Sequence, residues 1–184
     1  IRELDRELIV YITNPQGSNN EAEGYEEIDP TIPEVDEEGD PYDRAYRFQG
    51  YKLYQLKDAT VSVSDLEDPS KARLIYQGDK RDGVGRIINY EFNPDLNLTV
   101  PRMMVNGSDT GIVHAIRVTR DAFAQGDPTL VNFKAYYFLA IAYAYNNYQT
   151  FTITTNPETG AQEGRGQAFP YVPGRKAAFG AIRS

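Results

Sequence analysis

The chain has 184 residues, a net charge of −8, one histidine, 14 tyrosines and neither cysteine nor tryptophan. Without cysteine it can hold no disulfide, zinc–thiolate site or thiol nucleophile, and one histidine excludes a multi-histidine metal site. No apolar run approaches the roughly 20 residues that cross a bilayer, and the acidic balance argues against a phosphate-backbone partner, so we expect no membrane insertion and no nucleic acid. The length fits one domain with insertions, and because the chain begins at Ile1 we expect a processed protein or a piece of a longer one.

Short runs of β-branched and aromatic residues, closed by turn residues, predict strands along most of the chain. Helix signals are few: the capping-box spacing of Ser64 and Glu67 predicts one turn that Pro69 ends, and residues 121–125 predict another. The pattern favours an all-β fold, an antiparallel β-sandwich. The predicted strands are 7–13, 47–56, 73–77, 85–92, 111–119, 135–145 and a short last strand near 179–182.

The negative charge is concentrated in residues 21–43, which hold eleven Asp and Glu and neither Lys nor Arg. Without this segment, 16 acidic residues face 19 basic ones. Three prolines in the segment disfavour a helix and predict an extended loop. A solvated acidic linker is one interpretation. A calcium loop is the other, since calcium prefers oxygen ligands, and no other cofactor is expected. The calcium ligands would be Asp36, Glu38, Asp40 and Asp43.

The spacing between one leucine and one tyrosine narrows the choice among β-sandwich folds. Leu130 and Tyr136 lie six residues apart at the start of the apolar run 135–145, where a tyrosine hydroxyl can bond back to the preceding loop, as in the tyrosine corner of sandwiches. With Phe138, Ala140 and Ala142 on one face, the run resembles the sixth strand of a fibronectin type III domain. The resemblance implies a single such domain over residues 1–184, of the fibronectin type III or immunoglobulin-like class, with long insertions at about 14–46, 78–111 and 146–176.

Several longer motifs resemble a module of large secreted or cell-surface proteins of the Bacteroidota, which usually leave the cell by type IX secretion. They are GYKLYQLKDATVSVSDLEDPSKARLIYQGD, NYEFN, LVNFKAYYFLAIAYAYNNY and PYVPGRK. The resemblance implies an extracellular or cell-surface location and a structural or adhesive role. It adds nothing about the ligand, because one fold serves many functions.

The sequence offers no catalytic constellation. His114 alternates with Ile112 and Ile116 on a predicted strand, which favours a packed or hydrogen-bonded histidine over a general base. Ser108 and Asp109 are near it in sequence, but no G-x-S-x-G elbow is present. Paired carboxylates in the acidic segment lack the burial and fixed separation that glycoside hydrolysis needs. We therefore expect no enzymatic activity.

The face of 135–145 opposite the sandwich core is the candidate interaction surface. It is too apolar for water, so something is expected to cover it. In order of preference the cover is the chain's own insertions, a second module or subunit, or a ligand such as a glycan stacked on tyrosines. The face comprises Tyr137, Leu139, Ile141, Tyr143 and Tyr145.

The leading functional hypothesis is a structural interaction module that contacts sister modules or other copies of the same protein. The alternatives are an adhesin or carbohydrate-binding module, and an accessory domain of a secreted hydrolase. Exposed aromatic side chains in an open groove would favour carbohydrate binding, and strand exchange between copies would favour the interaction module.

Overall fold

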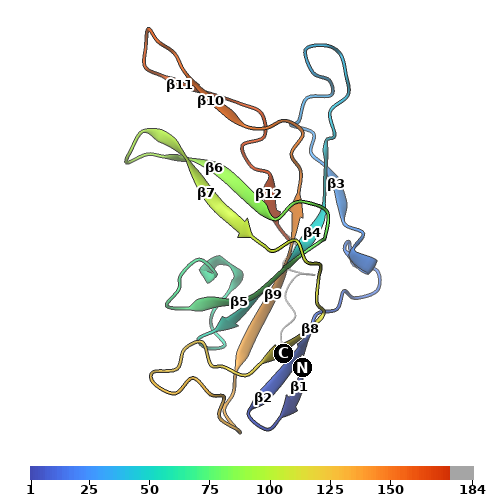
Figure 1. The fold of residues 1–184 in the computed structure, drawn as a ribbon, viewed down its shortest axis with the longest axis vertical. Helices are drawn as coiled ribbons and strands as arrows, with labels where there is room; N and C mark the ends of the chain where they lie inside the picture. Colours follow the sequence, from blue (N-terminus) through green and yellow to red (C-terminus); the bar gives the residue numbers. More distant parts are fainter. Residues whose placement is uncertain (175–184) are drawn as a thin grey trace.

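The structure, a computed structural model, describes residues 1–174 (Figure 1). This part of the chain is all-β with antiparallel pairing throughout and contains no α-helix, which confirms the expected class. Its strands are β1 (Arg2–Leu4), β2 (Glu7–Tyr11), β3 (Glu26–Ile28), β4 (Ala45–Leu56), β5 (Ala72–Asp79), β6 (Arg86–Asn93), β7 (Leu98–Asn106), β8 (Ala115–Val118), β9 (Tyr137–Tyr145), β10 (Thr152–Thr155), β11 (Gln162–Arg165) and β12 (Tyr171–Pro173). Two 3-10 turns accompany them, η1 (Glu21–Glu23) and η2 (Val63–Asp65).

Two sheets pack face to face over the main core. One has the order β1-β2-β8, and the other has the order β12-β9-β4-β3 with β5 also paired to β4. The core between them joins apolar side chains of β2 and β8 to side chains of β4 and β9, and buried Leu130 joins it from the loop before β9. Its buried members are Val10, Ile12, Phe48, Tyr51, Leu53, Ile116, Val118, Leu130, Phe138 and Ala140.

A β-bulge in β4 changes the side of the sheet on which Phe48 lies. Simple alternation places Phe48 with Gly50 and Lys52, away from Tyr51. In the structure Phe48 pairs with Ala144 and Gly50 with Tyr143, so Gln49 is an extra residue. Phe48 therefore turns to the core side, where its ring lies 4.9 Å from that of Tyr51. The expectation was wrong because a bulge shifts the two-residue period by one.

The predicted strands are present with shifted ends, except that the last one, near 179–182, lies outside the described residues. The strand predicted over 111–119 is only β8, Ala115–Val118, so His114 precedes it. Strands β1, β3, β7, β10, β11 and β12 were not predicted. In β7 the sequence signal is masked by Pro101, which is tolerated because β6 is the only strand within residues 1–174 that pairs with β7, so the other edge of β7 has no ladder to break.

The insertions form the projecting parts of the molecule (Figure 1). Residues 78–111 contain the two-stranded ribbon β6–β7, and residues 146–176 contain the hairpin β10–β11. Near the end of residues 146–176, β12 pairs with β9 and belongs to the main sheet.

Candidate functional site

The predicted interaction surface, the outer face of β9, is largely buried by the chain itself. Leu139, Ile141 and Tyr143 are buried, and Tyr137 and Tyr145 are half-buried. The face is therefore a second core rather than a surface offered to a partner. The preferred explanation was cover by the chain's own insertions; the ribbon within residues 78–111 supplies part of the cover, and the loop 57–71, which is not one of those insertions, supplies the rest. The buried tyrosines also provide no stacking platform for a glycan.

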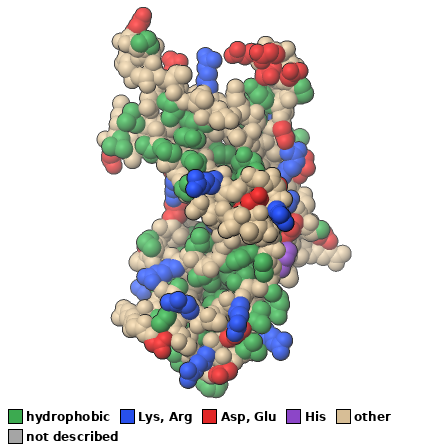
Figure 2. Space-filling view, viewed as in Figure 1, with side chains coloured by type: hydrophobic (Ala, Val, Ile, Leu, Met, Phe, Trp, Pro, Cys, Tyr) green, Lys and Arg blue, Asp and Glu red, His purple; other side chains and the backbone are tan. Residues whose placement is uncertain are grey.

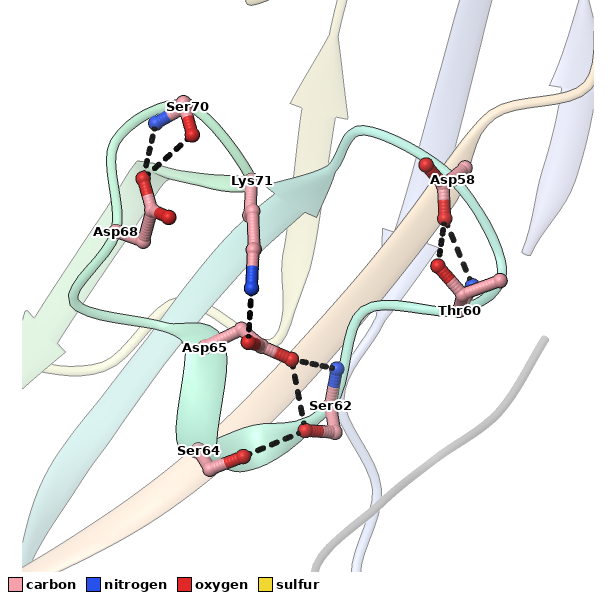
Figure 3. A network of polar contacts seen from close by, with 8 residues as sticks. All are labelled: Asp58, Thr60, Ser62, Ser64, Asp65, Asp68, Ser70 and Lys71. Atoms are coloured by element: carbon pink, nitrogen blue, oxygen red, sulfur yellow. Dashed lines mark hydrogen bonds and ion pairs between the residues drawn. The ribbon is translucent and has the colours of Figure 1, made fainter.

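The loop 57–71 covers one half of this face. Val61 and Leu66 of the loop pack against the cluster that contains Leu139 and Ile141. Three carboxylates fold the loop by closing short turns onto hydroxyl and amide groups (Figure 3). The loop is thus held by local polar contacts, and Val61 and Leu66 are free to face the sheet.

Asp65 is the centre of that loop network. Its carboxylate accepts hydrogen bonds from the Lys71 ammonium at 2.6 Å and from the backbone N–H and the hydroxyl of Ser62 at 3.0 and 2.9 Å (Figure 3). These bonds, Lys71 first, lower the pKa of Asp65 to about 2. The capping box is therefore Ser62–Asp65, and the predicted pair Ser64–Glu67 was wrong: the shorter aspartate reaches back to Ser62, whereas Glu67 pairs with Arg102.

The base of the β6–β7 ribbon covers the other half. Ile87 and Val105 of the ribbon pack with Tyr143 of β9 and Tyr171 of β12, and all four are buried. The Tyr143 ring lies directly over Gly50, where an added Cβ would come within 2.6 Å of the Tyr143 hydroxyl and 2.2 Å of the Gly78 carbonyl oxygen. A glycine at position 50 is thus required for the ring to approach the sheet.

Lys52 is the one lysine buried in this second core among the described residues. Its ammonium donates to the Met104 carbonyl oxygen at 2.5 Å and lies 4.7 Å from the centre of the Tyr171 ring. Burial lowers the pKa of Lys52 to about 8, partly offset by the charge of Glu67. The amine links the ribbon to the sheet and has no carboxylate within ion-pair distance among residues 1–174.

The acidic segment 21–43 is anchored by the chain itself. Within it β3 pairs with β4, and Ile32 is buried against Tyr46. Arg44 pairs with Glu34, and Arg47 pairs with Asp43 and Glu26. Strand pairing, one apolar anchor and two arginines therefore order the acidic segment. Figure 2 shows acidic side chains gathered at one end of the molecule, where the β3–β4 loop lies in Figure 1.

The four proposed calcium ligands do not form an ion site. Asp36 closes a turn, with one carboxylate oxygen accepting the N–H groups of Glu38 and Asp40 at 3.0 and 2.8 Å, while Asp43 is paired with Arg47 at 2.5 Å. Glu38 and Asp40 are exposed. Within residues 1–174, no three histidine or acidic side chains are arranged to hold a metal ion.

His114 is a hydrogen-bonded histidine, one of the two arrangements that the sequence favoured, although it lies before β8 and not on it. Its Nε2 lies 2.7 Å from the Glu23 carboxylate, and the ring is about half exposed. No serine hydroxyl bonds to it among the described residues. Ser108 and Asp109 do not join it, since the Asp109 carboxylate accepts the backbone N–H groups of Asp82 and Gly83.

The predicted structural pair lies where the spacing placed it. Leu130 is buried in the main core, and the Val131 N–H donates to the Tyr136 hydroxyl at 2.8 Å.

The sequence did not indicate a neighbouring polar group: Asp121, buried near the same loop, accepts bonds from the Gln55 amide at 2.7 Å and the Lys134 ammonium at 2.6 Å. Burial raises the pKa of Asp121, but these bonds and the Phe123 N–H outweigh it and lower the pKa overall.

The open apolar surface lies on the β6–β7 ribbon, which sequence reasoning missed. Paired residues of an antiparallel ribbon share a face, so the pairs Ile88–Met103, Tyr90–Pro101 and Phe92–Thr99 lie on one side. We call this side the ribbon face. Phe92 is 61% and Met103 51% exposed, whereas Tyr90 stacks on Phe151 at 4.6 Å. Figure 2 shows apolar side chains gathered over this part of the molecule.

The opposite side of the ribbon points to the body of the molecule. Arg102 on that side pairs with Glu91 and with Glu67 of the loop 57–71, and Asn89 exchanges hydrogen bonds with the Tyr171 backbone. The ribbon is therefore fixed on this side by the apolar packing at its base and by polar contacts, and Phe92 and Met103 on its other side face outward. An alternation signal was available in INYEF, but Pro101 in β7 hid the partner strand.

Comparison with known proteins gives no match to a family model, to a curated protein or to a solved structure. Within residues 1–174 we find no helix with the length and apolar character needed to cross a bilayer.

Proposed function

We propose that the chain is a non-enzymatic interaction module of a secreted or cell-surface protein, contacting modules of the same kind or other copies of itself through the ribbon face. The observation that carries the proposal is the outward apolar side of β6–β7, with Phe92 and Met103 more than half exposed. A two-stranded ribbon is marginal in water without packing, and apolar faces of this kind usually mark protein contacts.

The sheet topology supports a fibronectin type III-like module. By the resemblance, the run with Leu8, Val10 and Ile12 corresponds to the second strand, residues 50–54 to the third and the run 135–145 to the sixth. In the structure these runs lie in β2, β4 and β9. In immunoglobulin-like sandwiches the second strand belongs to one sheet, and the third and sixth pair in the other. Here β2 pairs with β1 and β8, while β4 pairs with β9, and the Tyr136 hydroxyl bonds to the loop before β9.

The extracellular setting is carried by the resemblance to modules of type IX-secreted proteins of the Bacteroidota. Calcium has no part in the proposal, because the four candidate ligands are not gathered.

Sedimentation velocity of the full chain over a concentration series tests the proposal. We expect reversible self-association that is lost in the double variant Phe92→Ser/Met103→Ser. Leu74→Ser is the matched control, because Leu74 lies on β5 and is 49% exposed outside the ribbon. A chain that stays monomeric at high concentration, or one whose association survives the double variant, would contradict the proposal.

A further inference from the structure

One edge of the main sheet is left incomplete. Strand β9 runs over nine residues, and β4 pairs with each of them along one side, with Gln49 of β4 left unpaired at the bulge. On the other side β12 pairs only with residues 143–145, and the Gly174 N–H extends the ladder by one bond to the Ala142 carbonyl oxygen at 2.8 Å. No other described residue pairs with residues 137–141 on this side. We call these five positions the open edge.

The open edge has the composition of an interior strand. Its residues, YFLAI, include no charge and no proline, the two devices that normally keep an exposed edge from pairing. Because the N–H and C=O of Ala142 face this side, those of Ala140 and Phe138 face it as well, by the two-residue period of a strand. Four backbone polar groups therefore need partners next to an apolar surface.

A groove adjoins the same edge. It has a volume of about 220 Å³ and is lined by main-core residues such as Ile12, Phe48 and Ala140, together with the end of β12 from Val172 to Gly174. Most of the lining is apolar, and Glu27 lies at its rim. A sheet edge with a groove for side chains is the arrangement that binds an extended peptide as an added strand.

We propose that the open edge and its groove form a strand-acceptor site whose occupant is residues 175–184 of this same chain. The segment RKAAFGAIRS follows Gly174 directly, at the last ladder bond. Continuing that antiparallel pairing places residues 175–179 opposite residues 141–137. Its composition also fits: an apolar centre, AAFGAI, suits the groove, and Arg175 and Lys176, with no acidic residue in the segment, suit the rim with Glu27.

Amide hydrogen exchange by NMR on the full chain tests the proposal, with the Ala140 N–H as the reporter of the open edge and the Ile141 N–H, which faces β4, as the reporter of folding. We expect the Ala140 amide to be protected at a level similar to the Ile141 amide. In Lys176→Pro, which removes the N–H that would donate to the Ala140 carbonyl oxygen, exchange at Ala140 should speed up about 100-fold while Ile141 stays protected.

Arg183→Pro is the matched control, since residue 183 lies beyond the five positions needed, and it should leave Ala140 protected. Rapid exchange of Ala140 in the unsubstituted chain would overturn the proposal. Protection that survives Lys176→Pro would show another occupant and would overturn it as well. Protection that grows with protein concentration would assign the site to a strand from a second copy, which also contradicts occupation by the same chain.

Discussion

The outer face of β9 and the ribbon face are two apolar β surfaces, of which the first is covered by the chain and the second is exposed. The first lies against the loop 57–71 and the base of the ribbon, and its central side chains are buried. The second faces outward with Phe92 and Met103 exposed. Both alternate apolar residues in the same way, so the period shows that a face is apolar but not what covers it. Whether an apolar face is covered depends on which distant segments of the chain pack against it.

The closest packing on the covered face gives the largest expected effect. Gly50→Ala would place a Cβ 2.2 Å from the Gly78 carbonyl oxygen and against the Tyr143 ring. Backbone cannot yield easily, so we expect the free energy of unfolding to fall by more than about 3 kcal/mol. Chemical denaturation measures it. A loss below 1 kcal/mol, the order of an ordinary surface change, would mean that Tyr143 does not pack on the sheet.

Matched truncations on the two faces compare them directly. Leu139→Ala removes a buried side chain and should cost roughly 2–3 kcal/mol of unfolding free energy. Phe92→Ala removes a larger but exposed one and should cost less than about 0.5 kcal/mol. Urea midpoints of the two variants give the comparison, and equal losses would remove the distinction between the faces.

The pH dependence of stability reports the buried amine beneath the ribbon. The pKa of Lys52 is about 8 in the folded chain and 10.5 as its ordinary value, so the unfolded state binds this proton more tightly. Protonation therefore opposes folding, and stability should rise by about 1.5 kcal/mol between pH 8 and pH 9.5. Above pH 10 ionisation of tyrosines, such as buried Tyr143 with its raised pKa, acts in the opposite direction.

Denaturation at the two pH values measures this rise, and Lys52→Met serves as its control because it removes the titrating group. The slope should disappear in that variant. A slope that is the same in both chains would assign it to other groups and would place the Lys52 amine in water.

A smaller effect than that of the Lys52 charge is expected in the loop before β9, which lies outside both faces. Tyr136→Phe removes the hydroxyl that accepts the Val131 N–H and should cost about 1 kcal/mol. Thermal unfolding followed by circular dichroism detects the shift. If the melting temperature does not change, this hydrogen bond is replaced by water at no cost and does not hold the corner.

Local signals explain which parts of this fold were predictable. The runs that became β2, β4, β5, β6 and β9 carry β-branched and aromatic residues over several positions, and the Leu130–Tyr136 spacing fixes a contact only a few residues long. The bulge at Gln49 was hidden, because it arises from the pairing of β4 with β9 across about 90 residues of chain. Covered and open faces were likewise decided by distant segments.

Whether the role of a candidate site residue could be predicted from the sequence likewise depended on how far away its partner lies. Asp36 and its neighbours carry oxygens of the kind that calcium binds, but backbone N–H groups within the turn donate hydrogen bonds to the Asp36 carboxylate. His114 was paired with Glu23, which is 91 residues away, so no local pattern could show it. The ribbon face was missed because Pro101 interrupts the strand pattern of β7, although proline is harmless on a free edge.

Hydroxyl-radical footprinting of the unsubstituted chain, at low and high protein concentration, tests most directly whether the outer face of β9 is internal and the ribbon face is the contact surface. We predict that Tyr143 is protected at both concentrations, while Phe92 and Met103 are oxidised readily in the dilute sample and protected in the concentrated one. Rapid labelling of Tyr143 in the monomer, or labelling of Phe92 and Met103 that does not change with concentration, would contradict the account.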